Sequence, residues 1–478
     1  TVYTYAQNVS DDATLLGPIV QPESINYDDL QIIDDNCVRS LTKEPVTLIA
    51  LQAIKDKTVS TLSDSYCYGL QKVYLDPVGI TENTRFSWSD ATVEDIKKRN
   101  PELANEVFLL PTNKKRPFMV AGSAIVGPSA GAPYRSKHHN MSMMEFTPLY
   151  VGAMRNLDIS YIDGSDMGPH WVKKQKTYKR HIGGYIEPYA FAAGSPVLDD
   201  TTAPEVGLQE SQTSGILSVP APNDVVDLSH VTGASGYAPG AFLEASYIPN
   251  AAEMAGMHYS YWSPADAKPE LTDMLYTDGG CYENDALLPF LQRGVEKIIL
   301  FINAGTPLKP SEDWDVDTDE HSNDQIDDNI QSFFGILMDN KEIYQRSYQQ
   351  DRNHVFPQEE YSNLIHKLQS AQASGTGLIA RMNLITIENE WWGIPAGFEV
   401  DVTFVYMGRL NIWEKSLSVD MQTRIIPTDG NPDDMSNTID NGEFKHYPHY
   451  QTAAGLLTYA QSNLLADMSG WSVGRSLC

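Results

Sequence analysis

A strand, a glycine turn, a helix and a second strand follow one another between residues 273 and 303, and this order constrains the fold most strongly. Residues 273–277 have the pattern of a short strand and residues 281–293 that of an amphipathic helix, and residues 295–303 form an apolar run typical of a buried strand. Because a strand-helix-strand connection joins parallel strands, we predict an α/β fold with a central, mostly parallel sheet between helices.

Other segments predict further elements around this sheet. The chain shows no internal repeat and no low-complexity linker, so we expect one large domain over residues 1–478. Residues 191–250 are rich in Gly, Pro, Ser and Thr, which predicts long surface loops or a lid. Helices are predicted at 46–59, 94–107 and 359–373, a buried strand at 117–126, and a half-buried strand in an additional antiparallel region near a sheet edge at 398–407.

The charge of the chain limits its partners. With 63 acidic and 34 basic residues the formal net charge is -29, which argues against duplex nucleic acid, where cationic side chains supply most of the affinity. A lipid partner would have to be contacted through apolar groups or through a local basic cluster. One such cluster, which is either a solvated loop face or a patch that contacts headgroups, comprises Lys173, Lys174, Lys176, Lys179 and Arg180.

Hydropathy and cysteine usage define the expected environment. No apolar run reaches the ~18 residues of a spanning helix, so we expect a soluble protein without a transmembrane segment. Sequons at Asn8 and Asn140 favour an extracellular or lumenal location. No CxxC pair or zinc-like spacing occurs among the four cysteines, which are Cys37, Cys67, Cys281 and Cys478.

An acidic segment at residues 312–328 is the one candidate for a bound ion. Its alternating carboxylates are similar to those of a calcium loop, but the Gly at the sixth position and the closing Glu of an EF-hand are missing. The segment is therefore either a solvated loop or a calcium site, and no other cofactor is expected. The candidate calcium ligands are Asp313, Asp315, Asp317 and Asp319.

Asp278 is the strongest candidate for a catalytic residue. It lies where the predicted strand ends and the predicted helix begins, and Gly279 and Gly280 allow a tight turn and close backbone approach. A carboxylate at such a place can act as a general base when burial raises its pKa. An Asp-Gly sequence also marks ordinary turns, so a purely structural turn is the alternative.

Residues 278–289, followed by Arg293-Gly294-Val295, resemble the catalytic-aspartate segment of the cytosolic phospholipase A-two and fungal phospholipase B (lysophospholipase) family of patatin-like acyl hydrolases. Residues 116–118, 144–152 and 446–450 are similar to further segments of that family, in the same order. The resemblance implies a sheet between helices and a serine-aspartate dyad that hydrolyses acyl esters of a lipid or lysolipid. It assigns Asp278 as the base.

The nucleophile of this family lies in a Gly-x-Ser-Gly elbow, and no such motif occurs between Thr1 and Arg116. Two substitutes are Ser129, in Gly-Pro-Ser-Ala-Gly, and Ser235, which follows a predicted strand at 225–231 and precedes a possible helix at 241–246. Cys281 is expected to be a buried structural thiol.

Since neither serine has the context of an elbow, we expect the nucleophile just upstream of Thr1, on a segment that processing would turn into a companion peptide. The alternative is a relative without catalysis that serves as an acidic binding or structural protein.

Overall fold

The computed structural model divides the chain into two compact units. Unit 1 comprises Thr1–Asn8, Val46–Tyr282 and Lys341–Gln349, and unit 2 comprises Val9–Pro45, Glu283–Asn340 and Gln350–Cys478. The structure describes residues 5, 11–43, 46–81, 83–111, 117–131, 141–162, 177–186, 192–193, 225–236, 256–266, 272–281, 283–336, 352–425, 439, 442–450 and 456–477.

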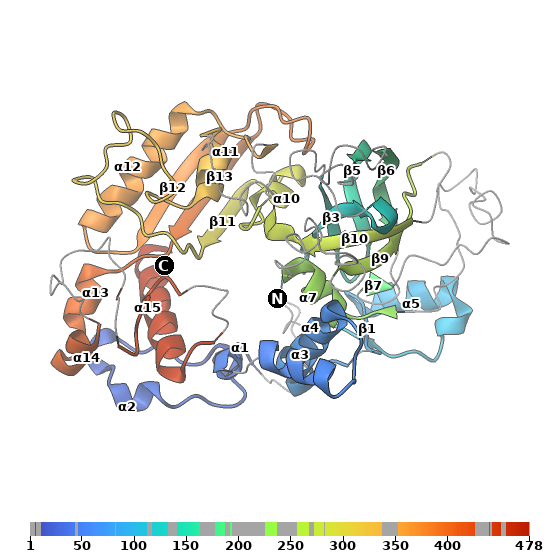
Figure 1. Cartoon of the computed structure of the whole chain (residues 1–478). Helices are drawn as coiled ribbons and strands as arrows, with labels where there is room; N and C mark the ends of the chain where they lie inside the picture. The colour runs from blue at the N-terminus through green and yellow to red at the C-terminus, as the bar shows by residue number, and fades with distance from the viewer. Residues whose placement is uncertain are drawn as a thin grey trace, which may run out of the picture. The chain divides into compact units, whose positions relative to one another are not determined.

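Unit 1 is built on a six-stranded sheet (Figure 1). Its strands are β3 (Ala121–Pro128), β4 (Ser142–Phe146), β5 (Val151–Ile162), β6 (Thr177–Ile186), β9 (Met257–Tyr261) and β10 (Thr272–Asp278). They lie in the order β6-β5-β4-β3-β10-β9, and every neighbouring pair is antiparallel. In the β3–β10 pair, Asp278 lies opposite Ser123 and Met274 lies opposite Pro128.

Three helices of unit 1 form a chain of contacts that reaches the sheet through α7. They are α3 (Val46–Lys55), α4 (Leu62–Leu70) and α7 (Leu228–Gly236). Helix α4 contacts α3 and α7, and α7 contacts β3 and β10. Helix α4 begins at Leu62 because the Thr61 hydroxyl accepts the Asp64 N–H at 3.0 Å and caps the helix. The close approach of α4 to α3 needs Gly69, since a Cβ there would lie 2.8 Å from the Val46 carbonyl oxygen.

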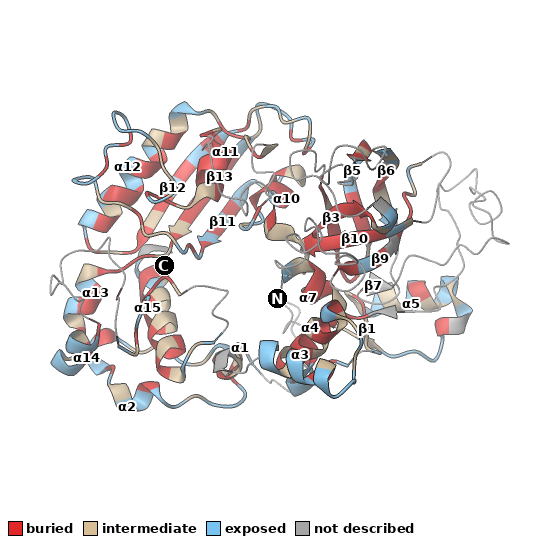
Figure 2. Ribbon diagram, viewed as in Figure 1, coloured by how far each residue is buried: buried red, intermediate tan, exposed pale blue. Residues whose placement is uncertain are grey.

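Aromatic rings fill the core of unit 1. Tyr259 and Tyr276 meet edge to face with centroids 5.6 Å apart, and Phe146 meets Tyr259 in the same way at 5.7 Å. Figure 2 shows that burial concentrates on β3, β10 and α7. The remaining elements of unit 1 are η4 (Gln71–Leu75), η5 (Asp76–Val78), β1 (Arg85–Phe86), α5 (Asp90–Arg99), η6 (Pro101–Leu103), β2 (Phe108–Leu109), η7 (Ser129–Gly131), β7 (Ala192–Ala193), β8 (Val225–Val226) and η10 (Gly279–Cys281).

Unit 2 has a smaller sheet of three strands, β11 (Lys297–Ile302), β12 (Leu378–Ile385) and β13 (Glu399–Tyr406). Strand β13 is central, parallel to β11 and antiparallel to β12. Helix α12 (Glu359–Ala373) packs on β12. The other elements are α1 (Asp12–Leu16), η2 (Pro22–Ser24), α2 (Tyr27–Leu30), η3 (Val38–Lys43), α10 (Leu287–Gln292), α11 (Asp328–Phe333), α13 (Asn411–Ser416), α14 (Val419–Arg424) and α15 (Tyr459–Leu477).

The mixed α/β class is confirmed, but the predicted central parallel sheet conflicts with the structure. The two strands expected to pair, β10 and β11, belong to different sheets in different units. Within the described residues the only parallel pairs are β1–β2 and β11–β13. The predicted helix at 281–293 shrinks to α10 because Pro289, which lacks an N–H, fits only into a first helical turn. Helix α10 is therefore too short to form the crossover connection between two parallel strands of one sheet.

Several local predictions can be compared with the structure directly. The helix at 359–373 is confirmed at both ends, and the strand at 398–407 is confirmed as β13. The edge position predicted for that strand is wrong, because it has a neighbour on each side. Residues 228–236 form a helix and not the continuation of a strand. Of the loop region 191–250 only residues 192–193 and 225–236 are described.

A core substitution in unit 2 tests the packing of α12. Leu364 is fully buried on the face that meets β12, whereas Ser370 is exposed on the same helix. We expect Leu364→Ala to lower the free energy of unfolding by about 2–5 kcal/mol, since it leaves a cavity. Ser370→Ala should leave it within about 0.5 kcal/mol of the parent. Urea denaturation of both variants measures the difference, and equal midpoints would contradict the packing.

A buried carboxyl group should make unit 2 sensitive to pH. Burial raises the pKa of Glu283 from 4.5 to about 7, although backbone N–H groups donate to it. Between these values the folded state holds a proton that the unfolded state has released, so stability must fall as pH rises through this window. Glu283→Gln keeps an acceptor for the N–H groups of Asp285 and Leu287, which lie 2.7 and 3.1 Å from Oε1. Denaturation midpoints measured from pH 5 to 8 should depend less on pH in this variant.

Candidate functional site

Asp278 lies at the carboxyl end of β10, where η10 begins. It is partly buried, and its Oδ1 accepts the N–H of Gly280 at 2.8 Å. Burial raises the pKa of the Asp278 carboxyl, and the hydrogen bond from Gly280 opposes that rise only in part. The carboxylate is therefore a stronger base than an exposed aspartate.

The two glycines after Asp278 have different structural roles. A Cβ on Gly279 would lie 2.8 Å from the Gly122 carbonyl oxygen, so only glycine lets η10 approach β3 this closely. Gly280 supplies the N–H that closes the turn on Asp278. The close approach expected from the sequence is thus made to a neighbouring strand of the same unit.

A single buried hydroxyl joins the end of β10 to the end of α7. Ser123 Oγ lies 2.8 Å from the Ala234 carbonyl oxygen and 2.9 Å from the Thr277 carbonyl oxygen. A serine hydroxyl has one hydrogen to donate, which these two oxygens share. Ala234 directly precedes Ser235 and Thr277 directly precedes Asp278, so the structure brings these two candidate residues to the same place.

Tyr66 of α4 is a third side chain at this place, and the sequence analysis missed it. Its hydroxyl donates to the Gly236 carbonyl oxygen at 3.3 Å. Burial, followed by the charge of Asp278, raises the pKa of Tyr66 to about 12. The phenol therefore lies near the carboxylate. Nothing in the local sequence distinguishes Tyr66 from the other tyrosines, of which the chain has 25 in total.

Ser129 is placed elsewhere. It begins η7, directly after the Pro128 that pairs with Met274. The Asp273 carboxyl is the partner of its hydroxyl. Against the effect of burial, the hydrogen bond from His258 and then that from Ser129 lower the Asp273 pKa. Asp273 and Asp278 are separated by five steps of an extended strand, or about 17 Å. Ser129 and Asp278 are thus at opposite ends of β10.

The cysteines and the acidic segment were the remaining candidates for chemistry in the sequence. Cys37, Cys67 and Cys281 are buried, and Cys478 lies outside the described residues. Across the described part of the chain, no three or more His, Cys, Asp or Glu side chains are grouped so that they could hold a metal ion.

Three of the four calcium candidates have hydrogen-bond partners in the protein. Asp317 pairs with His366 at 2.9 Å, and Asp315 and Asp319 accept backbone N–H groups. Calcium binding by Asp313, Asp315, Asp317 and Asp319 stays a prediction.

Residues 446–450, a segment of the family resemblance, have a structural role in unit 2. His449 is buried, and its Nδ1 lies 2.7 Å from the Ala304 carbonyl oxygen, to which it donates. Burial lowers the pKa of His449, against the effect of that hydrogen bond. The imidazole is therefore neutral and anchors the loop after β11.

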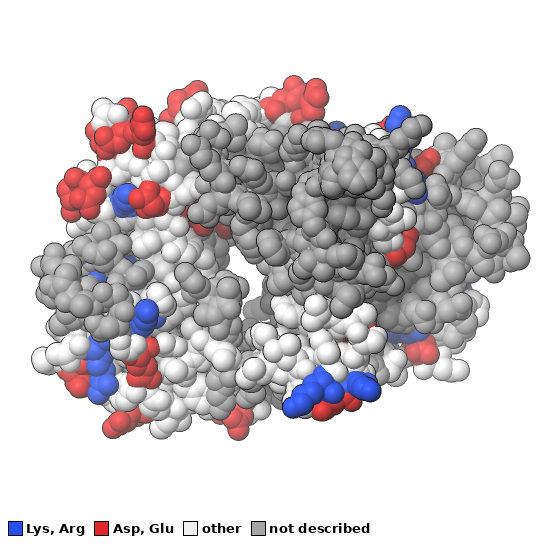
Figure 3. Space-filling model, viewed as in Figure 1, with Lys and Arg blue, Asp and Glu red and all other residues white. Residues whose placement is uncertain are grey.

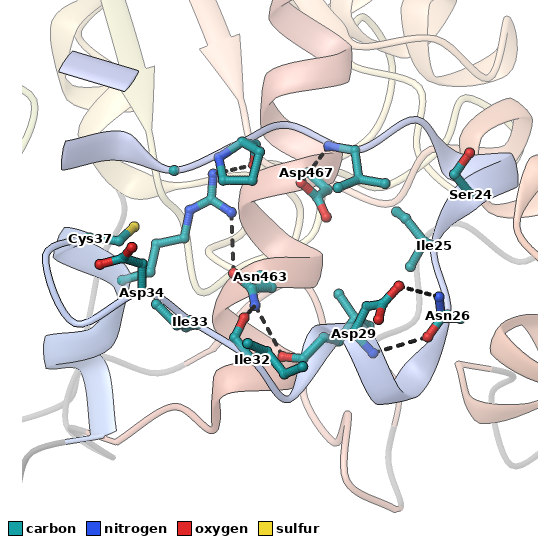
Figure 4. Close-up of a pocket in the computed structure, with 15 residues that line it drawn as sticks. Ser24, Ile25, Asn26, Asp29, Ile32, Ile33, Asp34, Cys37, Asn463 and Asp467 are labelled. Carbon is teal, nitrogen blue, oxygen red and sulfur yellow. Dashed lines mark hydrogen bonds between the residues drawn. The ribbon is translucent and has the colours of Figure 1, made fainter. Parts of the chain in front are cut away.

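Unit 2 also contains a cavity of about 380 Å³ between the segment 17–39 and α15 (Figure 4). Its polar groups serve the chain itself. Arg39 donates to Asn463 Oδ1 at 3.2 Å, Asn463 donates to two backbone oxygens, and Asp467 Oδ1 accepts the Val20 N–H at 2.9 Å. These bonds hold the N-terminal segment on α15, so we interpret the cavity as a packing feature.

Part of the basic cluster noted in the sequence lies within the described residues. Lys179 and Arg180 lie on β6, and Arg180 donates to the Thr272 hydroxyl at 2.9 Å, whereas residues 173–176 lie outside the described residues. Figure 3 shows the described acidic side chains in several separate groups. In the described chain, no helix combines the length and the apolarity needed to cross a membrane.

Comparisons with protein-family models, with curated proteins and with solved structures find no match for this chain. The evidence on the site is therefore its own geometry.

Two glycine substitutions test how tightly the site is built. In Gly279→Ala the new Cβ meets a backbone oxygen at 2.8 Å, whereas in Gly236→Ala its nearest contact is the Tyr66 hydroxyl at 3.9 Å. We expect Gly279→Ala to lower the free energy of unfolding by about 1–3 kcal/mol, and Gly236→Ala to leave it within about 0.5 kcal/mol. Thermal unfolding monitored by near-UV circular dichroism compares them, and an unaffected Gly279→Ala variant would contradict the close approach to β3.

Proposed function

We propose that the chain is a serine-dependent hydrolase of lipid or lysolipid acyl esters, with Asp278 as general base and Ser235 as nucleophile. The observation that carries the proposal is the Ser123 hydroxyl, which lies within 2.9 Å of the carbonyl oxygens that precede both residues. The resemblance of residues 278–289 to the catalytic-aspartate segment of the phospholipase A-two and phospholipase B family supports it independently.

The chemistry follows from a carboxylate whose pKa is raised. Asp278 takes the hydroxyl proton as Ser235 Oγ attacks the ester carbonyl carbon, and it returns that proton to the leaving alcohol. In the second step Asp278 deprotonates water, which attacks the acyl-serine, releases the fatty acid and restores the hydroxyl. Burial makes the carboxyl suited to this exchange because it lowers the cost of holding the proton.

Ser235 departs from the family pattern in one respect. It occupies the last turn of α7, whereas the nucleophile of the family follows a strand in a tight elbow. A nucleophile upstream of Thr1 on a companion peptide and a non-catalytic acidic binding protein are the alternatives, and the experiment below distinguishes all three.

Labelling with a fluorophosphonate probe tests the assignment. Mass spectrometry of the labelled protein should find the adduct on Ser235, and a lysophospholipid should be hydrolysed. Ser235→Ala should abolish labelling, and Asp278→Asn should slow both reactions by about 10²–10⁴-fold, because the base is lost.

The matched control is Ser129→Ala, which removes a serine hydroxyl at the far end of β10 and should label like the parent. Melting temperatures of all variants exclude unfolding as the cause. An adduct on another peptide would place the nucleophile there. No adduct on any serine, together with no hydrolysis, would reject the hydrolase and favour the binding protein.

A further inference from the structure

Unit 2 gathers three carboxyl groups where α10 and α11 begin. Glu283 and Asp285 precede α10, and Asp327 caps the first turn of α11. Asn284 joins the two places, because its backbone N–H donates to Asn329 Oδ1 at 3.4 Å. Glu283, Asp285 and Asp327 are called the carboxyl cluster below.

Two members of the cluster accept backbone N–H groups. Glu283 Oε1 accepts those of Asp285 and Leu287 at 2.7 and 3.1 Å. Asp327 Oδ1 accepts the backbone N–H and the side-chain amide of Asn329 at 3.0 and 3.1 Å. Bonds of this kind satisfy the first N–H groups of a helix, so the start of a helix explains both.

Asp285 has no such role. Its Oδ2 is closed to solvent and has no hydrogen-bond partner, and it is the only carboxylate oxygen among the described residues of which both are true. An ionised carboxylate without water or a donor is costly, whereas a protonated carboxyl group carries no charge. Burial, followed by the charges of Glu283, Asp327 and Asp328, raises the pKa of Asp285 well above its usual value. Asp285 therefore keeps its proton where an exposed aspartate has lost it.

The groups that face the cluster from other elements do not neutralise it. Asp328 lies in the first turn of α11, and Tyr406 of β13 accepts the Asp327 N–H at 3.0 Å and donates to the Thr306 carbonyl oxygen at 2.5 Å. Burial and the charges of Asp327, Asp285 and then Tyr361 of α12 raise the pKa of Tyr406. Within the described residues, the side-chain charges that shift the pKa of Asp285 are thus all negative.

We propose that the carboxyl cluster is an acid-dependent latch, which holds residues 283–287 on the start of α11 when it is protonated and releases them when it is ionised. The latch lies within unit 2 and does not depend on the proposed hydrolase reaction. It makes this part of the chain closed in an acidic environment and locally open in a neutral or alkaline one.

The direction of the switch follows from proton linkage. Burial raises the pKa of Glu283 from 4.5 to about 7, and burial also raises the pKa of Asp327. Between the unfolded and the folded pKa values the closed segment holds protons that an open segment has released. Closure must therefore weaken as the pH rises through this window, and the loss is complete above the folded pKa values.

Hydrogen–deuterium exchange of the full chain, read by mass spectrometry at pH 5, 6, 7 and 8, tests the latch. After correction for the intrinsic pH dependence of amide exchange, protection of residues 283–292 and 327–333 should fall about tenfold or more between pH 5 and 8. Helix α12 is the internal reference, because it belongs to the same unit but not to the latch, and its protection should fall less.

Two substitutions remove the charges and keep the size of the side chains. Asp285→Asn and Glu283→Gln should each reduce the fall in protection, and the double variant should reduce it to less than about threefold, since only Asp327 then titrates. The matched control is Glu312→Gln, which removes an exposed carboxyl group of the same unit and should behave like the parent.

Three results would overturn the proposal. They are protection of both segments that does not depend on pH in the parent, an equal fall in α12, which would show unfolding of the whole unit, and a fall that persists in the folded double variant. The first two need only the parent protein, so the latch can be rejected even if the variants do not fold.

Discussion

One buried hydroxyl group, that of Ser123, connects a helix and two strands of unit 1. Ser123 is fully buried on β3, and its Oγ bridges Ala234 of α7 and Thr277 of β10. A buried carbonyl group needs such a donor, because it would otherwise lose its hydrogen bond to water without replacement. The last turn of α7 is thereby tied to the end of β10, and the backbone segments that carry Ser235 and Asp278 lie next to each other.

The two aspartates near the ends of α7 show how local hydrogen bonds determine the direction in which the pKa of a buried carboxyl group shifts. Both are shielded from water, which by itself raises a carboxyl pKa. Asp278 receives one backbone N–H, and its pKa stays raised. Asp227 receives two N–H groups of His230 and a hydroxyl, and its pKa is lowered. Asp278 is thus suited to exchange a proton, whereas Asp227 is suited to anchor a histidine.

Sheet pairing is where inference from sequence failed, and the reason is the range of the interactions. Strand β10, helix α10 and strand β11 all exist, since hydrophobic period, turn residues and proline position act within a few residues. Their assembly does not follow from these signals. β10 pairs with β3, about 150 residues earlier in the chain, and β11 pairs with β13, about 100 residues later. An edge or central position is decided by such distant partners, which is why β13 was expected at an edge.

The sequence by itself determined the helix Glu359–Ala373, the strand at β13 and the position of Asp278 at a strand end, because each depends on neighbouring residues. It left Ser129 and Ser235 as equal candidates. Only the tertiary structure shows which of them lies near Asp278, because the antiparallel register separates Ser129 from Asp278 by the length of β10, whereas α7 folds back onto the same end. It also decided in which direction the pKa of each buried carboxyl group shifts, because burial and hydrogen-bond donors are properties of the packed chain.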